Sequence, residues 1–239
     1  DLELGAILLA LRIKSESDEE LLGFCRAMQH ATQWLAIDKD AFVVVLPTYN
    51  GVRRHPNLLP LLALLLKTAG LKDLIHAQLN ETGIALLDIE QLNPGLNRLL
   101  SLRSRLGVRN SAHTLCKLLD PCPGQSIRVV NVTHPEYLIR MTALLKAQGG
   151  RAMLLRGTEG EAFANPRRRP ELMGFSNGVA EVLFPAEAGG TPPISGWPES
   201  ADYAENVRLI LQLLAEPQRI PQPIIDQVNA LTALSQPKA

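Results

Sequence analysis

The chain alternates short apolar runs with helix-like stretches, and this alternation restricts its fold more than any other feature. The runs Phe42–Leu46, Ser126–Val132 and Ala152–Leu155 are rich in valine, isoleucine and leucine, as expected of strands buried on both faces. A helical pattern joins the second run to the third and ends at Gly149 and Gly150. Strands that alternate with helices predict a mostly parallel sheet covered on both faces, with ligands bound at the carboxyl ends of the strands.

Helical patterns also lie at both ends of the chain. Apolar residues recur at helical spacing over Leu4–Leu11 and Leu21–Met28, and Ser17 and Glu20 before the second stretch have the spacing of a capping box. Two further amphipathic stretches are Ala201–Ala215 and Ile224–Leu234. We expect a small N-terminal helical domain and a larger α/β domain. The expected ranges are 1–38, with 93–120 packed onto it, for the helical domain, and 39–92 with 121–239 for the α/β domain.

The alternation breaks at Leu71, where another strand is expected. Leu71–Gln78 has the pattern of a helix instead, and Ile84–Leu87 is typical of a short strand. Either the topology changes here or residues are missing from the sequence. Further along, Leu96–Leu106 predicts a helix that Gly107 ends, and Thr133 is the predicted N-cap of the helix after Ser126–Val132.

The cysteines and the apolar runs indicate a cytoplasmic protein. Cys25, Cys116 and Cys122 are an odd number, and their spacing matches no zinc or disulfide framework, which favours buried, reduced thiols. The longest apolar run, Leu58–Leu66, contains a proline and is far shorter than the roughly 20 residues that cross a bilayer. We expect no membrane contact. The sequence opens within a helical pattern, so an N-terminal piece could be missing.

Positive charge is concentrated in the middle of the chain. The segment Arg98–Arg169 holds 13 of the 24 Lys and Arg residues and only four of the 24 Asp and Glu residues, so it carries nine excess positive charges while the whole chain is neutral. Clustered arginine is most often matched by phosphate, in a nucleotide or a polynucleotide backbone. Two more arginines lie in the basic loop of residues 47–57. The candidate nucleic-acid-binding residues are Arg53, Arg54, Arg98, Arg103, Arg105, Arg109, Arg151, Arg156, Arg167, Arg168 and Arg169.

The composition favours binding without base recognition. Aromatic residues are 4% of the chain, of which only Tyr49 lies in the basic loop, and no helix-turn-helix or zinc finger is evident. We therefore predict electrostatic binding of DNA with little sequence preference, by a homodimer whose basic surfaces join into one groove. The sequence does not separate DNA from RNA.

Three segments carry a family resemblance. Leu4–Met28, Leu106–Asn110 with the residues that follow it to Pro121, and Leu155–Gly160 resemble the anthranilate phosphoribosyltransferase superfamily, of glycosyl transferase family 3. The resemblance covers most of the chain and implies a nucleoside phosphorylase/phosphoribosyltransferase-like fold, with a small helical dimerisation domain and a larger α/β domain. It also implies that Arg109 lies in the cleft between them.

The loop that would bind diphosphate departs from the family. In the active enzymes, Gly-Thr-Gly-Gly-Asp-Gly lets bare backbone N–H groups close on the diphosphate of phosphoribosyl diphosphate. The matching stretch is Pro47–Val52, and the hydroxyl residues expected after Asn57 are leucine and proline. The resemblance therefore implies a degenerate phosphate loop. Its residues are Thr48, Tyr49, Asn50, Gly51 and Asn57.

The magnesium ligands implied by the family are also replaced. The register from Gly157 and Gly160 puts Ala162 and Phe163 where the enzymes have an Asp-Glu pair. We predict no metal site, no catalytic residue and no cofactor. Glu159 and Glu161 lie nearby, but hard-cation sites demand a defined geometry that a shift of one residue disturbs.

Three segments are similar to the YbiB-like branch of the superfamily: Gly107–Thr114, Thr133–Tyr137 and Arg156–Glu161. This resemblance implies a homodimeric, sequence-tolerant DNA-binding protein without transferase activity. Two alternatives stay open. One is an active phosphoribosyltransferase that uses magnesium and phosphoribosyl diphosphate, and the other is a binder of small phosphorylated metabolites.

Overall fold

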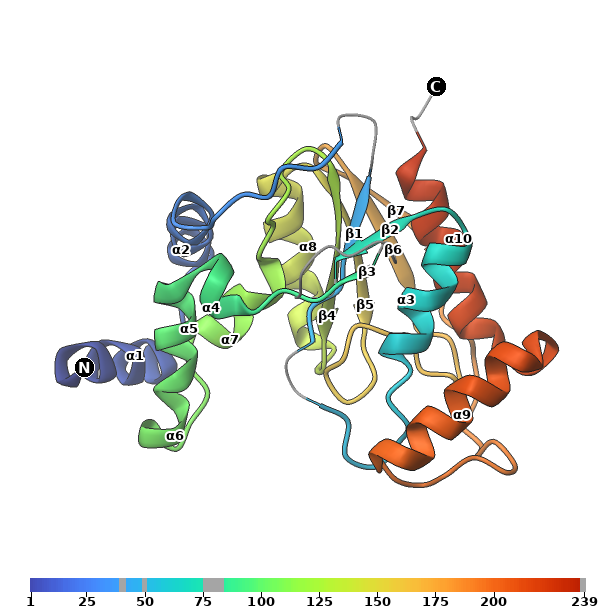
Figure 1. The fold of residues 1–239 in the computed structure, drawn as a ribbon. Helices are drawn as coiled ribbons and strands as arrows, with labels where there is room; N and C mark the ends of the chain where they lie inside the picture. Colours follow the sequence, from blue (N-terminus) through green and yellow to red (C-terminus); the bar gives the residue numbers. More distant parts are fainter. Residues whose placement is uncertain (39–41, 49–50, 75–83, 237–239) are drawn as a thin grey trace.

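A seven-stranded sheet forms the centre of the molecule. The structure, a computed structural model, describes residues 1–38, 42–48, 51–74 and 84–236. In the described residues the strand order is β3-β2-β1-β4-β5-β6-β7, with helices on both faces of the sheet and a further group of helices beside it (Figure 1). The predicted fold class is confirmed.

Five of these strands are parallel. They are β1 (Val43–Val45), β2 (Lys72–Leu74), β3 (Ile84–Ala85), β4 (Ser126–Val132) and β5 (Arg151–Arg156). All of β1 and β4 is buried. The predicted apolar runs are therefore confirmed as the central strands of the sheet.

The sequence reading missed an antiparallel hairpin at one edge of the sheet. Strand β6 (Leu172–Ser176) pairs with β5 and with β7 (Val179–Phe184), and both pairings are antiparallel. The hairpin turn consists of Asn177 and Gly178, which have φ angles of 49° and 85°. Asn-Gly is a strongly favoured sequence for a two-residue hairpin turn, because both positions need positive φ. The signal was therefore present in the sequence.

Two apolar clusters hold helices against the two faces of the sheet. On one face, α3 (Leu59–Thr68), α9 (Tyr203–Ala215) and α10 (Gln222–Ser235) pack over buried residues such as Val44 and Ile127. On the other face, α8 (Glu136–Gln148) and α2 (Asp18–His30) pack over residues such as Val130. A short 3-10 helix, η2 (Pro217–Arg219), joins α9 to α10.

The helices beside the sheet come from two separate parts of the sequence. Helix α1 (Leu2–Lys14) contacts the later segment directly, since a Cβ added to Gly5 would meet the Leu106 side chain at 3.3 Å. The capping box of Ser17 and Glu20 is present at the start of α2. The later segment forms α4 (Ile89–Leu92), α5 (Pro94–Ser101), α6 (Arg103–Leu106), α7 (Ala112–Leu115) and η1 (Cys116–Leu118).

Three local predictions need correction. Leu71–Gln78 is not a helix at its start, because Lys72–Leu74 pair with β1 as a parallel strand; residues 75–78 lie outside the described part. The helix predicted over 96–106 is two helices divided at Leu102, though Gly107 ends the second with φ 72°. Thr133 is not the N-cap of α8, because the helix begins two residues later, after Pro135. Sequence periodicity misplaced these boundaries because strand pairing and the turn after β4 decide them.

The three cysteines are free and buried, as predicted. Among the described residues, no helix is both long enough and apolar enough to span a bilayer.

Candidate functional site

The carboxyl ends of β1, β4 and β5 lie at one edge of the sheet, at the bottom of Figure 1. The chain leaves β1 toward β2 on one side, whereas β4 and β5 follow on the other side. Such a switch in strand order opens a crevice where α/β proteins bind ligands. Three loops meet there, and their described residues are 46–48 with 51–58, 133–135, and 157–161.

The loop after β5 is a tight turn. A Cβ at Gly157 would lie 2.0 Å from the Glu161 carbonyl oxygen, so only glycine fits at this position. Glu159 and Gly160 both have positive φ, of 51° and 92°, and Thr158 pairs with Glu161 in an isolated bridge. This geometry aims both glutamate side chains at the loop that follows β1.

Both glutamates accept hydrogen bonds from backbone N–H groups after β1, one in the degenerate phosphate loop and two from the residues just beyond Val52. Glu161 Oε1 accepts from Gly51 N–H at 2.6 Å, and Glu159 Oε2 accepts from the N–H groups of Arg53 and Arg54 at 2.6 and 3.0 Å. Burial alone would raise the pKa of Glu159, but the Arg54 and Arg53 N–H groups and the charges of His55 and Arg54 lower it overall. The Glu161 carboxylate thus lies against an amide of the stretch that the resemblance matches to the diphosphate loop, and the Glu159 carboxylate lies against the two amides that follow it. We call this arrangement the glutamate latch.

The residues present do not fit a magnesium ion in the way the resemblance implies. Ala162 and Phe163 are completely buried and carry no ligating side-chain atom. Gln227 from α10 hydrogen-bonds the backbone on both sides of Phe163, so this segment belongs to the core. Among the described residues, no group of three His, Cys, Asp or Glu side chains is arranged to hold a metal ion.

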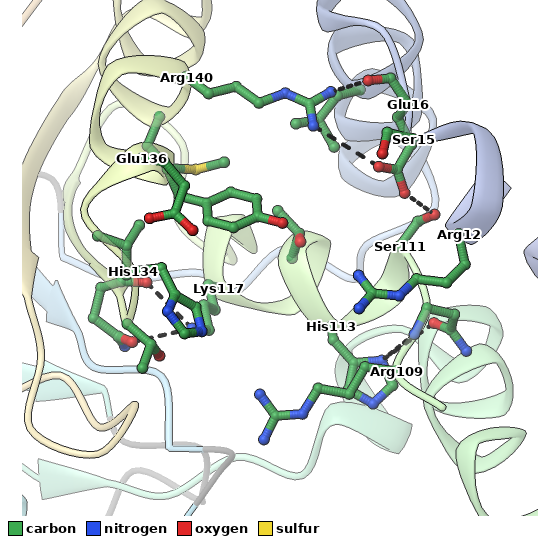
Figure 2. A pocket seen from close by; sticks show the side chains of 18 residues that line it. Arg12, Ser15, Glu16, Arg109, Ser111, His113, Lys117, His134, Glu136 and Arg140 are labelled. Carbon is green, nitrogen blue, oxygen red and sulfur yellow. Dashed lines mark hydrogen bonds and ion pairs between the residues drawn. The ribbon is translucent and has the colours of Figure 1, made fainter. Parts of the chain in front are cut away.

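A cavity of about 380 Å³ lies between the N-terminal helices and the end of β4 (Figure 2). Its charged and imidazole-bearing lining residues are Arg12, Glu16, Arg109, His113, Lys117, His134, Glu136 and Arg140. Positive groups outnumber carboxylates, so the cavity favours an anion.

Burial lowers the pKa of two basic side chains in this cavity. The pKa of Lys117 is lowered mainly by burial, and its Nζ donates to the Asn131 carbonyl and side-chain oxygens at 3.2 and 3.1 Å. Burial, and then the charges of Arg103 and Arg109, lower the pKa of His113 to about 4. His113 is therefore neutral at pH 7.

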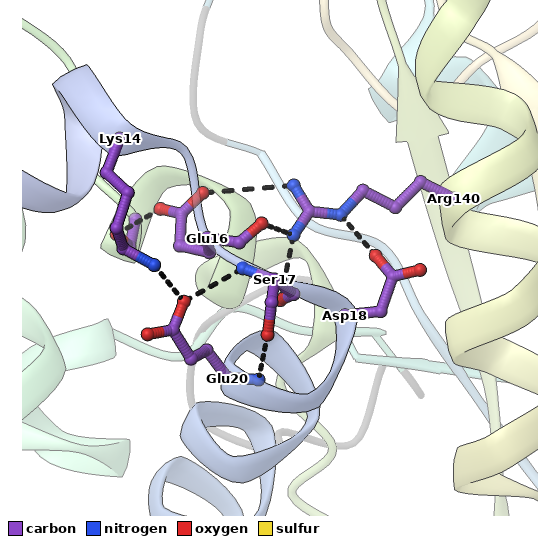
Figure 3. Close-up of polar contacts among 7 residues, drawn as sticks. Lys14, Glu16, Ser17, Asp18, Glu20 and Arg140 are labelled. Atoms are coloured by element: carbon purple, nitrogen blue, oxygen red, sulfur yellow. Dashed lines mark hydrogen bonds and ion pairs between the residues drawn. The ribbon is translucent and has the colours of Figure 1, made fainter.

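Arg140 fastens α8 to the start of α2, at the rim of the cavity. Its guanidinium lies 2.8 Å from the Asp18 carboxylate and 3.8 Å from that of Glu16, and it donates to the carbonyl oxygens of Glu16 and Ser17 (Figure 3). Glu16 also accepts a hydrogen bond from Ser111 in α7's N-cap position. These contacts fix one wall of the cavity. They also pair the charge of Arg140 with two carboxylates.

Several predicted arginines surround the crevice without a partner. Among the described residues, no hydrogen bond or ion pair holds the exposed guanidinium groups of Arg53, Arg54, Arg109 and Arg156. Arg167 is partly buried, and its Nη2 lies 3.2 Å from His55 Nε2. We call Arg53, Arg54, Arg109, Arg156 and Arg167 the displayed arginines.

Two other predicted arginines are structural. Arg151 Nη1 donates to the carbonyls of Leu234 and Ser235 at the end of α10, and its guanidinium lies 4.2 Å from the centre of the Phe42 ring. Arg169 forms an ion pair with the buried Asp226 in α10. We call Arg151 and Arg169 the anchoring arginines.

The remaining predicted positions are dispersed. Arg98 and Arg105 pair with Asp1 at 2.6 and 3.1 Å, and Arg103 is exposed on α6, from where its charge acts on His113. Arg168 donates to the Gly189 carbonyl. The 13 central cations therefore do not form one surface.

The loop residues have structural roles where the structure describes them. Gly51 has φ 62°, and Asn57 accepts from Leu59 N–H at 3.1 Å while its carbonyl accepts from Asn206 in α9 at 3.0 Å. Thr48 is exposed at the end of β1. Tyr49 and Asn50 lie outside the described residues.

Sequence reasoning missed Arg12, Lys117 and Arg140 as cavity residues. Lys117 gave a usable signal, since a lone lysine between the apolar residues Cys116 and Leu118 has to find polar partners when it is buried. Arg12 and Arg140 gave none, because a single arginine on a helix is common and no local pattern indicates that α1 and α8 border one cavity.

Comparisons with known proteins agree with this geometry. The helical bundle domain of the glycosyl transferase family matches residues 1–32. The anthranilate phosphoribosyltransferase of Anaeromyxobacter sp. (strain Fw109-5) is 25% identical; the alignment covers 62% of this chain and 52% of that enzyme, so the chain spans about half of its length. The Saccharomyces cerevisiae anthranilate phosphoribosyltransferase structure in complex with PRPP and Mg superposes with a TM-score of 0.71 at 16% identity, covering 98% of this chain and 76% of that one. The fold is therefore that of these transferases.

A relative with higher sequence identity indicates which members of this class the chain resembles. YbiB of Escherichia coli (strain K12) is 36% identical, over 93% of this chain and 79% of YbiB. The chain belongs to the anthranilate phosphoribosyltransferase superfamily, as its motifs predicted, and is similar to YbiB within it.

Proposed function

We propose that this protein binds the phosphate backbone of DNA with little sequence preference, as a homodimer and without magnesium or phosphoribosyl diphosphate. The proposal rests on a contrast, in the loop after β1, between the backbone and the side chains of Arg53 and Arg54. The N–H groups of Arg53 and Arg54 are satisfied by the glutamate latch, whereas their side chains are exposed and unpaired among the described residues. The loop therefore directs positive charge outward.

The glutamate latch argues against phosphoribosyl transfer. A diphosphate would have to displace two carboxylates from three N–H groups, and the displaced Glu159 and Glu161 would repel it. Ala162 and Phe163 lie in the core, so no side chain at those positions would hold a metal cation that offsets this repulsion. A polynucleotide on the outside of the loop meets no such obstacle.

The displayed arginines support a backbone contact. They come from several loops around one edge of the sheet, and phosphate contacts from such side chains position a duplex or strand without reading bases. Their binding should weaken steeply with salt, since each neutralised phosphate releases about one counterion.

Helix α1 supports the homodimer. It is apolar on more than one face, and Leu2, Ile7 and Ile13 are 85%, 56% and 84% exposed. A helix that is apolar around its circumference is normally buried. A second copy of the chain seated on α1 would cover these residues and bring two basic edges into one assembly.

Fluorescence anisotropy with labelled DNA tests the proposal. We expect binding to single strands and duplexes at low salt, with a linear fall of log affinity against log salt. Arg53→Gln/Arg54→Gln should lower affinity on the order of tenfold and reduce that slope by about two. The matched control Lys67→Gln/Lys146→Gln removes two exposed charges near the ends of α3 and α8, away from the loop, and should leave both values unchanged.

No binding to either form of DNA at low salt would overturn the proposal. Ribosylated product, or magnesium-dependent binding of phosphoribosyl diphosphate, would instead favour the transferase. Saturable nucleotide binding that DNA does not displace would favour a metabolite binder.

A further inference from the structure

A second cavity, of about 360 Å³, is lined in part by residues of the basic loop. Three segments distant in sequence line it: residues 54–56, 165–167 and 193–199. Its size is at the lower end of the range for small-ligand sites, which suits a single nucleotide unit rather than a larger group.

The cavity combines an aromatic ring, apolar walls and positive charge. Trp197 is partly buried against the core cluster under α3 and α9 and lines the cavity together with Ile194 and four prolines. Arg54, His55 and Arg167 supply the basic groups, and Glu199 is the single carboxylate in the lining. Aromatic rings beside arginines are the usual means by which proteins hold unpaired bases, since every base has a face that stacks.

The basic groups are held in place by the fold. The glutamate latch fixes the backbone at Arg54, and Arg167 Nη2 lies 3.2 Å from His55 Nε2, a contact that joins two of the segments lining the cavity. Asn165 fixes the other side, because its Oδ1 accepts from Arg167 N–H at 3.0 Å. A site whose charged groups are already positioned loses less conformational entropy when it binds.

We propose that this cavity is a base-binding subsite, which takes one unpaired base of a single-stranded polynucleotide against Trp197 while Arg54 and Arg167 contact the flanking phosphates. The inference rests on the proposed function and extends it, because it makes the protein prefer single strands over duplexes. Bases in a duplex are stacked on each other and cannot enter such a cavity without being unpaired.

The test compares three labelled probes at one salt concentration. They are an oligothymidylate of about 16 nucleotides, an abasic strand of the same length, and a duplex of the same length. The wild type should bind oligothymidylate about fivefold to a hundredfold more tightly than the abasic strand, the range expected for stacking of one base. Trp197→Ala should abolish that difference and leave the affinity for the abasic strand and the duplex unchanged.

Two variants control for damage to the fold. Trp197→Phe keeps an aromatic face and should retain most of the preference, whereas Trp34→Ala removes a 65% exposed tryptophan outside the cavity and should retain all of it. In a Trp34→Phe background, oligothymidylate should quench the emission of Trp197 and the abasic strand should not.

Equal wild-type affinity for oligothymidylate and the abasic strand would overturn the subsite, as would a Trp197→Ala effect that is the same on all three probes. Displacement of the oligonucleotide by free thymidine monophosphate at similar concentration would also overturn it, since the cavity would then be a nucleotide site. Loss of wild-type binding to all three probes would instead refute the proposed function, so the two failures are distinguishable.

Discussion

The anchoring and the displayed arginines come from the same charged stretch of sequence, with Arg53 and Arg54 added from the loop after β1, but they have opposite surroundings. Arg151 and Arg169 reach α10, where carbonyl oxygens and the buried Asp226 accept their hydrogen bonds. Arg109 and Arg156 are exposed at the crevice and, among the described residues, have no such partner. The arginines that cluster in the sequence therefore form two groups in the structure. One group holds α10 in place, and the other lies exposed at the crevice.

The difference predicts that the two groups respond to different measurements. Removing an anchoring arginine leaves buried acceptors or a buried charge without a partner, which destabilises the fold. Removing a displayed arginine affects only what approaches from solvent, and exposed charges seldom change stability by more than about 0.5 kcal/mol.

The largest effect should come from Arg169→Ala. Among the described residues, the substitution leaves the carboxylate of Asp226, a residue that is 4% exposed, with Gln222 as its one side-chain donor. Breaking a buried pair from one side costs about 3–5 kcal/mol. Urea unfolding should show this loss, while the folded fraction binds DNA with unchanged affinity.

The double variant Arg169→Met/Asp226→Leu separates charge from shape. It removes both members of the pair, so it should be less destabilising than Arg169→Ala alone. If the double variant unfolds as easily as the single one, the buried carboxylate is not the cause and Arg169 acts through its packing on Phe184, 5.4 Å away.

A second effect should appear as acid destabilisation through His113. Its pKa in the folded protein is about 4, below the ordinary value of 6.5, so the unfolded chain binds the proton more readily. Stability should be constant above pH 6.5, fall as the pH drops from 6.5 to 4, and level off below that with respect to this group. A shift of this size corresponds to about 3–4 kcal/mol.

Chemical unfolding at several pH values measures this dependence. The His113→Gln variant lacks the titrating group and should show a flatter profile between pH 6.5 and 4. An identical slope in both proteins would mean that His113 binds the proton equally well in the folded and the unfolded chain.

The third effect concerns binding alone. Arg109→Gln/Arg156→Gln should reduce the slope of log affinity against log salt by about two, while the midpoint of urea unfolding stays within experimental error. A clear loss of stability here would erase the distinction between displayed and anchoring arginines.

The fold was predictable because its signals are local. The buried runs at β1, β4 and β5, the capping box at Ser17 and the glycines that end α6 and α8 each act within a few residues. Strand β2 was misread because three residues give no periodicity, and its identity depends on pairing with β1.

The site was predictable only in part, because its decisive contacts join distant segments. The bond from Arg53 N–H to Glu159 links residues 106 positions apart, and Arg151 meets Leu234 across 83 positions. The family pattern drew attention to the loop and to Ala162 and Phe163, at the positions where the enzymes have an Asp-Glu pair. It could not indicate that Glu159 and Glu161 accept hydrogen bonds from the backbone after β1, or that Arg151 donates to carbonyl groups of α10.

The smallest expected effect is a change in the pKa of His113. It tests whether the charge of Arg109, a displayed arginine, is unpaired and screened by solvent. Burial is the main cause of the low pKa of His113, and the charges of Arg103 and Arg109 add to it because no carboxylate pairs with Arg109 among the described residues. Arg109→Gln should therefore raise the pKa of His113 by a fraction of a unit, which NMR titration of the imidazole resolves. Arg151→Gln, the matched change at an anchoring arginine, should leave it unchanged. Added salt should reduce the effect of Arg109 if this side chain is exposed to solvent, since solvent-exposed charges are screened and buried pairs are screened much less.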